Sequence, residues 1–236
     1  MKALIMDKTT TKTVSMVYSQ TQILEKSVYL VELLGARHEP MLHLKAAVFV
    51  QPNEKNLALL FEELRNPKYS EYHLFFSNVV SMDILSRLAK EDVNEVVKQV
   101  HEYYADFIPV NEDFFQLDTS VDTVGSISLS SQIRNLKTDY IFERNVNGIL
   151  SVLLATKKKP CQIRYQVNSD ISRRLAYEVV SHIDSDGIYV FQSQGPILLI
   201  LDRRDDPITP LLTQWTYQAM VHELLGMSSL LAHHII

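Results

Sequence analysis

The chain has 236 residues, of which 46% are hydrophobic and 22% charged, proportions that are ordinary for a globular protein. Its formal net charge of -5 argues against a nucleic-acid surface, which needs a basic excess. The single cysteine, Cys161, cannot form an internal disulfide, which suits a reducing compartment. No apolar run approaches the roughly 20 residues of a membrane span. We therefore expect a soluble, cytoplasmic protein whose association with any membrane is peripheral.

The first half of the chain alternates apolar runs with amphipathic stretches. The apolar runs predict strands at residues 2–6, 28–34, 46–51, 72–78 and 106–110. Asn53 is a suitable N-cap for a helix with an apolar face formed by Leu57, Leu60, Phe61 and Leu64. Helical spacing returns over residues 81–104, in two stripes: Ile84, Leu85, Leu88 and Ala89, then Val93, Val96, Val97 and Val100. This alternation predicts an α/β fold with a five-stranded parallel sheet flanked by helices.

The small, polar segment 119–131 has no periodicity and predicts a domain boundary. A second α/β unit follows, with a long helix over residues 135–159 and a helix over residues 171–183 capped by Ser169. A buried strand at residues 197–201 and a last helix ending near Gly226 complete it. We expect domains at residues 1–120 and 121–226, followed by a divergent tail at residues 227–236.

Catalytic and cofactor motifs are absent from the sequence. The six glycines fit neither the GxxxxGK[ST] nor the GxGxxG phosphate-binding pattern. The His-Glu pairs that begin at His101 and His222 lack the second histidine of a HExxH zinc motif. We therefore expect no cofactor, no metal and no catalytic residue.

The charged stretch that follows the last strand allows two interpretations. Asp206 precedes Pro207 and can cap the next helical turn, while Arg203 and Arg204 can pair with neighbouring carboxylates. The first interpretation is a structural latch made of Asp202, Arg203, Asp205, Asp206 and Trp215, with Trp215 on an apolar helix face. The alternative is a metal-dependent α/β hydrolase that uses Asp202, Asp205 and Asp206.

Long segments of the chain resemble the SM family, the Sec/Munc-type, syntaxin-binding proteins of vesicle fusion. The resemblance is carried by LLILDRRDDPITPLLTQWTYQAMVHELLG at residues 198–226 and by three segments of the first unit: KALIMD, HLKAAVFVQPNEKNLALLFEELRNPKYSEYHLFFSN and ADFIPVNEDFFQLD. The sequences of these segments are most similar to those of the vacuolar-protein-sorting branch, which works between the trans-Golgi network and endosomes.

The resemblance implies a function without catalysis. Residues 1–120 would form the syntaxin-binding first domain, and residues 121–226 an incomplete second domain. The protein would bind a syntaxin (t-SNARE) of the trans-Golgi or endosomal type, and would regulate SNARE assembly and membrane fusion between trans-Golgi network, endosomes and vacuole or lysosome. A SNARE complex and a Rab effector are further implied partners, and the location would be peripheral to Golgi and endosomal membranes. Because family members are more than twice as long, we expect a truncated product or short isoform.

The resemblance also places a pocket for a syntaxin N-terminal peptide in the first domain. Its central apolar side chain falls at Leu85, with Leu88 and Ala89 one turn on. Val97 and Val100 would lie on an adjoining helix, and Glu102 at an acidic position beside the pocket. The same apolar spacing is typical of a helix that faces its own core, so both interpretations remain open for these side chains.

Overall fold

The computed structural model describes residues 1–117, 136–191 and 195–225. The chain divides into two compact units, Met1–Gln116 and Leu117–Ile236, which are described separately. The predicted boundary segment 119–131 and the predicted tail 227–236 lie outside the described residues. Within the described ranges, no helix is both long and apolar enough to cross a membrane.

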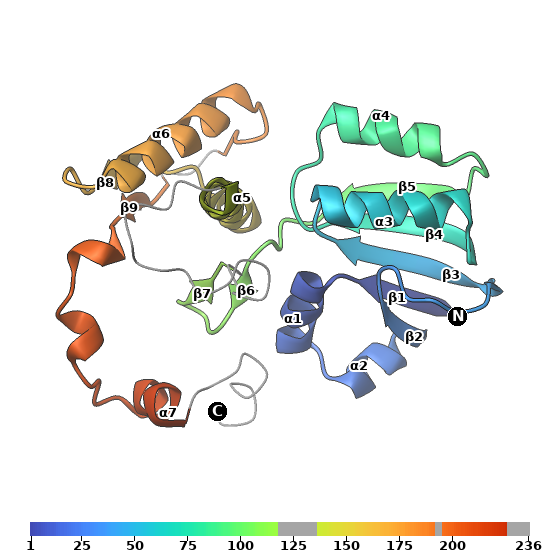
Figure 1. Ribbon diagram of the computed structural model, residues 1–236, viewed down its shortest axis with the longest axis horizontal. Helices are drawn as coiled ribbons and strands as arrows, with labels where there is room; N and C mark the ends of the chain where they lie inside the picture. The colour runs from blue at the N-terminus through green and yellow to red at the C-terminus, as the bar shows by residue number, and fades with distance from the viewer. Residues whose placement is uncertain (118–135, 192–194, 226–236) are drawn as a thin grey trace. The chain divides into compact units, whose positions relative to one another are not determined.

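Unit 1 is built on a five-stranded sheet of order β2-β1-β3-β4-β5, in which every neighbouring pair is parallel (Figure 1). The predicted fold class is therefore confirmed. The strands are β1 (Lys2–Met6), β2 (Val28–Leu33), β3 (Met41–Val50), β4 (Tyr69–Phe76) and β5 (Val97–Glu102). The helices are α1 (Lys8–Val17), α2 (Gln20–Glu25), α3 (Glu54–Arg65) and α4 (Met82–Glu91).

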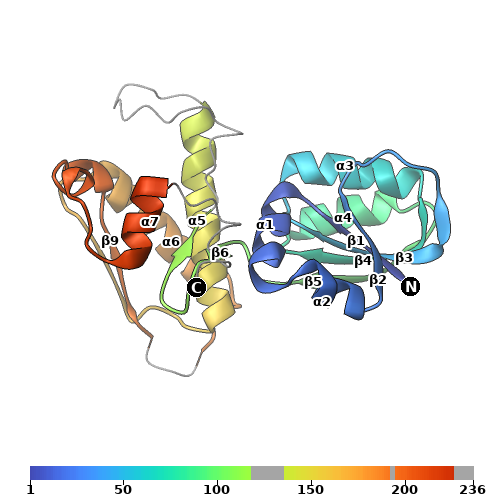
Figure 2. The same ribbon diagram turned by 90° about the horizontal axis from the view of Figure 1, so that it is seen from below.

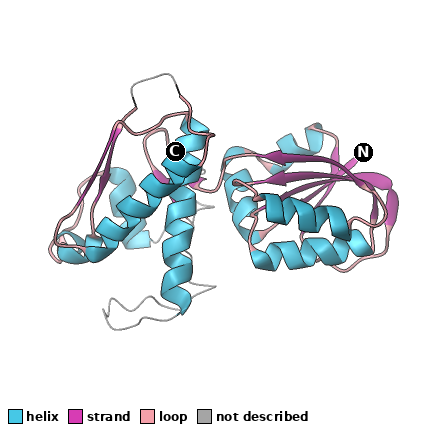
Figure 3. Ribbon diagram, turned by 90° about the horizontal axis from the view of Figure 1, so that it is seen from above, coloured by secondary structure: helices cyan, strands magenta, loops and turns pink. Residues whose placement is uncertain are grey.

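The core of unit 1 lies between one face of this sheet and the helices α3 and α4. Both helices lie on the same side of the sheet in views from below and from above (Figure 2; Figure 3). The helix predicted to follow Asn53 is confirmed, because the Asn53 side chain accepts a hydrogen bond from the Asn56 amide at 2.8 Å. Its apolar face is buried together with alternate strand residues: Leu57, Leu60, Phe61 and Leu64 pack with Ala46, Val48, Tyr72, Leu74 and Phe76.

The fifth strand is not where the sequence pattern predicted it. Residues 97–102 form β5 and not the end of a helix, because Asp92 caps α4 and its carboxylate accepts hydrogen bonds from the Val96 and Val97 amides at 2.9 and 3.0 Å. The predicted strand at residues 106–110 is reduced to β6 (Ile108–Pro109), which pairs antiparallel with β7 (Phe115–Gln116) outside the main sheet.

A register shift between β4 and β5 explains the error. Tyr72 pairs with Val97 and His73 with Gln99, so one extra residue, Lys98, lies between the two pairs. Such a bulge makes Val97 and Val100, three residues apart, face the same side of the sheet. A spacing of three is also the helical spacing, and the valines therefore matched both patterns.

The sequence of helix α1 has no apolar stripe that would predict it. A buried carboxylate, that of Asp7, instead holds the start of the helix in place. The Asp7 side chain caps the helix by accepting a hydrogen bond from the Thr10 amide at 2.7 Å. Its other oxygen accepts hydrogen bonds from the Gln51 amide and the Asn56 Nδ2, both at 2.6 Å. Asp7 follows β1 and Gln51 follows β3, at the carboxyl edge where doubly wound sheets bind ligands. In this chain that position holds an internal hydrogen-bond network.

Unit 2 contains a short parallel pair of strands beside two long helices. Its elements are α5 (Leu136–Thr156), β8 (Gln162–Tyr165), α6 (Asp170–Ser185), β9 (Ile197–Ile200), two 3-10 turns (Arg203–Asp205 and Thr209–Leu211) and α7 (Tyr217–Leu225). Strand β9 was predicted to be buried, but only Ile200 is fully buried. Ile197 and Leu199 are more than half exposed, so β9 has one covered face and one open face.

The charged stretch after β9 is held by hydrogen bonds around Asp202. The Asp202 carboxylate binds the Arg204 guanidinium at 2.7 Å and accepts a hydrogen bond from the Ser169 hydroxyl, the N-cap of α6, at 2.6 Å. The Asp202 amide donates to Gln166 Oε1 at 2.9 Å. The predicted place of Trp215 is wrong: it precedes α7 and is 92% exposed.

Replacing Asp7 with alanine is expected to lower the free energy of unfolding by about 2–4 kcal/mol. The variant loses the cap and leaves the Gln51 amide and the Asn56 side chain without their acceptor in a buried site. Ser81→Ala is the control, because Ser81 caps α4 in an exposed position and should cost only about 1 kcal/mol. Urea unfolding followed by far-ultraviolet circular dichroism compares them, and equal losses would contradict the importance of the buried network.

Asp202→Asn is expected to destabilise β9 and the start of α6 by about 1–3 kcal/mol at neutral pH. Hydrogen bonds from Arg204, and then from Ser169, hold the pKa of Asp202 below its usual range, so this stabilisation is present at neutral pH. It should be lost as the pH falls below about 4, where the unfolded carboxylate takes up its proton.

Hydrogen exchange of β9 and α6 peptides, in wild type and variant at the same pH, measures this difference. Asp205→Asn is the matched control, because the Asp205 carboxylate is exposed and accepts a hydrogen bond from the Gln166 side-chain amide, which an asparagine oxygen can also accept. A gap between wild type and Asp202→Asn that stays constant from pH 7 to pH 3 would contradict the role of the Asp202 charge.

Candidate functional site

Helix α4 lies alongside β5, the edge strand of the main sheet, because both of its ends are bound to that strand. At the C-terminal end of α4, Asp92 accepts hydrogen bonds from the amides of Val96 and Val97, at the start of β5. At its other end, Glu102 at the end of β5 accepts a hydrogen bond from the Val80 amide, just before the N-cap, at 2.7 Å. The helix therefore runs antiparallel to the strand.

The predicted pocket residues divide into exposed and buried groups. Leu88 is 4% exposed and belongs to the hydrophobic core, so it points inward. Leu85 and Val97 are partly buried against the edge of that core. Ala89 is exposed and Val100 is 38% exposed. We call Leu85, Ala89, Val97 and Val100 the α4–β5 surface.

The α4–β5 surface brings together residues from a helix and a strand. Val97 pairs with Tyr72 and Val100 with Leu74, and both of these β4 residues are buried in the core under the helices. Residues paired across parallel strands point to the same face, so Val97 and Val100 face the side that carries α4. The prediction that they lie on an adjoining helix is wrong, but they lie on the same side of the sheet as α4.

Glu102 has a structural position at this site. Its Oε1 accepts the Val80 amide, and its Oε2 accepts the Tyr104 hydroxyl at 3.0 Å. The carboxylate also lies near the N-terminus of α4, where the helix dipole favours a negative charge. Glu102 therefore orients the start of α4.

Two ion pairs hold α4 against α3. Arg87 binds Glu54 at 3.0 Å and also lies over the Phe61 ring, 5.2 Å from its centroid. Arg65 forms two hydrogen bonds with Glu91. Exposed pairs contribute little each. These two involve Glu54 and Arg65, the first and last residues of α3, so they join α4 to both ends of that helix.

The sequence pattern missed one residue beside this surface. Met82 is 77% exposed and lies three residues before Leu85, which places both side chains on one helix face. Its spacing from Leu85 and Ala89 was available in the sequence. Methionine adapts its shape to different apolar partners, so it can extend the α4–β5 surface by one turn.

The acidic residues of unit 2 do not support the hydrolase alternative. The Asp202 carboxylate is bound by Arg204 and Ser169, Asp205 accepts the Gln166 amide, and Asp206 accepts Thr209 and pairs with Arg203. Among the described residues, no three acidic, histidine or cysteine side chains are arranged to hold a metal ion. The polar contacts instead join the end of β9 to the start of α6. Of the predicted latch, only Trp215 lies outside these contacts.

Comparison with known proteins gives one consistent result. The model of the Sec1 family matches residues 2–233. The chain is 45% identical over 231 residues to vacuolar protein sorting-associated protein 45 of Dictyostelium discoideum. It is 46% identical over 234 residues to the protein of the same name from Mus musculus. Each match covers 97% of this chain and 39% of the relative. A structure described as the SM protein Vps45 in complex with the Qa SNARE Tlg2 matches with a TM-score of 0.89 at 45% identity, covering 97% of this chain and 40% of that one.

The chain thus spans about two-fifths of the length of the relatives that it matches. The match includes both units and runs through the segment 198–226 that carries the resemblance in the sequence. The chain belongs to the Sec1 family.

Proposed function

We propose that this chain binds a Qa SNARE (syntaxin) of the trans-Golgi or endosomal type and takes part in vesicle trafficking without catalysing a reaction. The support is its 45% identity to a protein whose structure is described in complex with the Qa SNARE Tlg2. The process that we propose for this chain is regulation of SNARE assembly and of membrane fusion between trans-Golgi network, endosomes and vacuole or lysosome. This chain would contribute the syntaxin-binding part.

The proposed binding site is the α4–β5 surface, extended by Met82. The observation that carries this proposal is the double attachment of α4 to β5, through Asp92 at one end and Glu102 at the other. This attachment leaves partly exposed apolar side chains at an edge of the domain whose helix and strand are joined at both ends. Such a surface suits the apolar anchor residues of a short peptide, and a preformed site reduces the entropy lost on binding.

Within this proposal the predicted site residues have different roles. Leu85, Ala89, Val97 and Val100 would contact the N-terminal peptide of the syntaxin. Leu88 would support Leu85 from the core, and Glu102 would position the start of α4. A SNARE complex and a Rab effector are further proposed partners, and partner binding would bring a cytoplasmic protein to Golgi and endosomal membranes.

Leu85→Arg and Ala89→Arg should each weaken the binding of a syntaxin N-terminal peptide by about tenfold or more. The substitutions place a charged, bulky side chain where an apolar anchor would be buried. The measurement is fluorescence anisotropy of a labelled N-terminal peptide of Tlg2, titrated with the chain and its variants. Ala89 is exposed, so its replacement leaves the core intact.

Leu24→Arg is the matched control, since Leu24 is 51% exposed on α2, which packs against β2 at the other edge of the sheet. It should bind the peptide like wild type. Circular dichroism confirms that each variant is folded. Loss of binding in Leu24→Arg alone, or wild-type affinity in Ala89→Arg, would rule out the α4–β5 surface. Absence of peptide binding by the folded wild-type chain would rule out N-terminal peptide recognition by this chain.

A further inference from the structure

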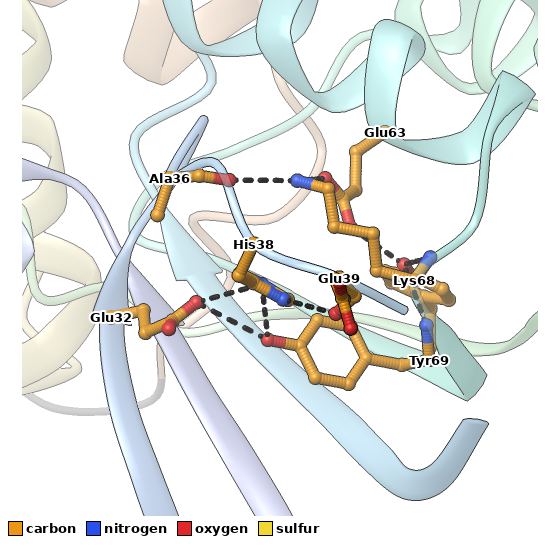
Figure 4. A network of polar contacts seen from close by, with 8 residues as sticks. Glu32, Ala36, His38, Glu39, Glu63, Lys68 and Tyr69 are labelled. Atoms are coloured by element: carbon orange, nitrogen blue, oxygen red, sulfur yellow. Dashed lines mark hydrogen bonds and ion pairs between the residues drawn. The ribbon is translucent and has the colours of Figure 1, made fainter. Parts of the chain in front are cut away.

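The connection between β2 and β3 is held down by two sets of polar contacts around a small pocket (Figure 4). Gly35 turns the chain with a φ of +85°, a conformation that favours glycine. The next carbonyl, that of Ala36, accepts a hydrogen bond from Lys68 Nζ at 2.8 Å. The same ammonium pairs with the Glu63 carboxylate at 2.8 Å, so the charge of Lys68 is already balanced.

His38 forms the second set of contacts. Its Nδ1 lies 2.6 Å from the Glu39 carbonyl oxygen, and its Nε2 lies 3.0 Å from Glu32 Oε2 (Figure 4). The Tyr69 hydroxyl lies 3.2 Å from the same Nε2 and 3.3 Å from the same Glu32 oxygen. The side chains of His38 and Glu32 are only 18% and 20% exposed, so water replaces these partners poorly.

The His38 ring can be neutral or protonated, and the number of hydrogens available for these contacts distinguishes the two forms. A carbonyl oxygen can only accept, so Nδ1 must carry a hydrogen. In a neutral ring, Nε2 would then be bare and would face a carboxylate oxygen. Burial, and the nearby carboxylates of Glu32 and Glu63, raise the pKa of Tyr69, so its hydroxyl remains a donor. That single hydrogen can satisfy either Nε2 or Glu32, but not both.

The imidazolium form satisfies every group. Nδ1 donates to the Glu39 carbonyl, Nε2 donates to Glu32, and the Tyr69 hydroxyl also donates to Glu32. We propose that His38 is a cationic strap, which in its protonated form closes the β2–β3 connection onto Glu32 of β2 and Tyr69 of β4, and which releases this connection when the proton is lost. The inference is independent of the proposed syntaxin binding.

The closed β2–β3 connection should be more stable at low pH, because its contacts need the positive charge of the protonated His38 ring. The strap stabilises the closed connection at low pH and is lost as the pH rises, because imidazole is the side chain that ordinarily changes charge between about pH 5 and 8. The other ionisable groups around the ring are Glu32, Glu63, Lys68 and Tyr69. Carboxylate, ammonium and phenol side chains as classes ordinarily change charge outside that pH range. A change over that interval is therefore assigned to His38.

Hydrogen exchange of peptides covering residues 33–41 tests the strap in the full chain. Between pH 6 and pH 8.5, and after correction for the intrinsic exchange rate, protection of the wild type should fall several-fold. His38→Arg keeps a permanent charge and should remain protected at both pH values. His38→Gln cannot carry the charge and should be poorly protected at both.

Two outcomes would overturn the proposal. One is wild-type protection that does not change with pH, and the other is His38→Gln that is as protected as wild type at pH 6. Nitrogen-15 NMR of the imidazole gives a direct and independent check, since both ring nitrogens must carry hydrogens at pH 6. A spectrum with one unprotonated nitrogen at that pH would equally contradict a cationic strap.

Discussion

The structure of unit 1 depends on the burial of one face of a parallel sheet under α3 and α4. Leu60, Tyr72 and Leu74 are at most 1% exposed in this layer, and burying each large apolar side chain contributes about 1.5–3 kcal/mol. Hydrogen bonds at the border of this core connect its elements. The Tyr72 hydroxyl donates to Glu63 at 2.8 Å and accepts from the Lys68 amide at 3.0 Å, which joins the end of α3 to the start of β4.

Local signals in the sequence, such as a capping residue or a periodic apolar stripe, were sufficient to predict the elements that are fixed by neighbouring residues. Helix α3 combines a capping asparagine with an apolar stripe, and both the cap and the buried stripe are where the sequence predicted them. Helix α1 was missed because its sequence, KTTTKTVSMV, lacks an apolar stripe; it is fixed instead by the buried Asp7, whose partners Gln51 and Asn56 are more than forty residues away. Contacts that distant leave no periodic signal.

The candidate site illustrates the same limit. Leu85 and Ala89 were placed correctly on a helix, whereas Val97 and Val100 were assigned to a second helix because a bulge at Lys98 gave a strand the spacing of a helix. The sequence could not separate Leu88, which is a core residue, from its neighbours, because burial is decided by where α4 crosses the sheet. In unit 2, Ser169 was predicted as a cap, but its bond to Asp202 could be seen only in three dimensions.

The proposed recognition of a syntaxin by the α4–β5 surface would protect the backbone of that surface when the partner binds. The most direct measurement is hydrogen exchange of the whole chain with and without a soluble Qa SNARE of the Tlg2 type, since it maps the footprint without assuming which residues matter. We predict that protection increases over residues 81–102, which contain α4 and β5. Saturating binding that leaves residues 81–102 unchanged, while protecting another part of the chain, would contradict the account.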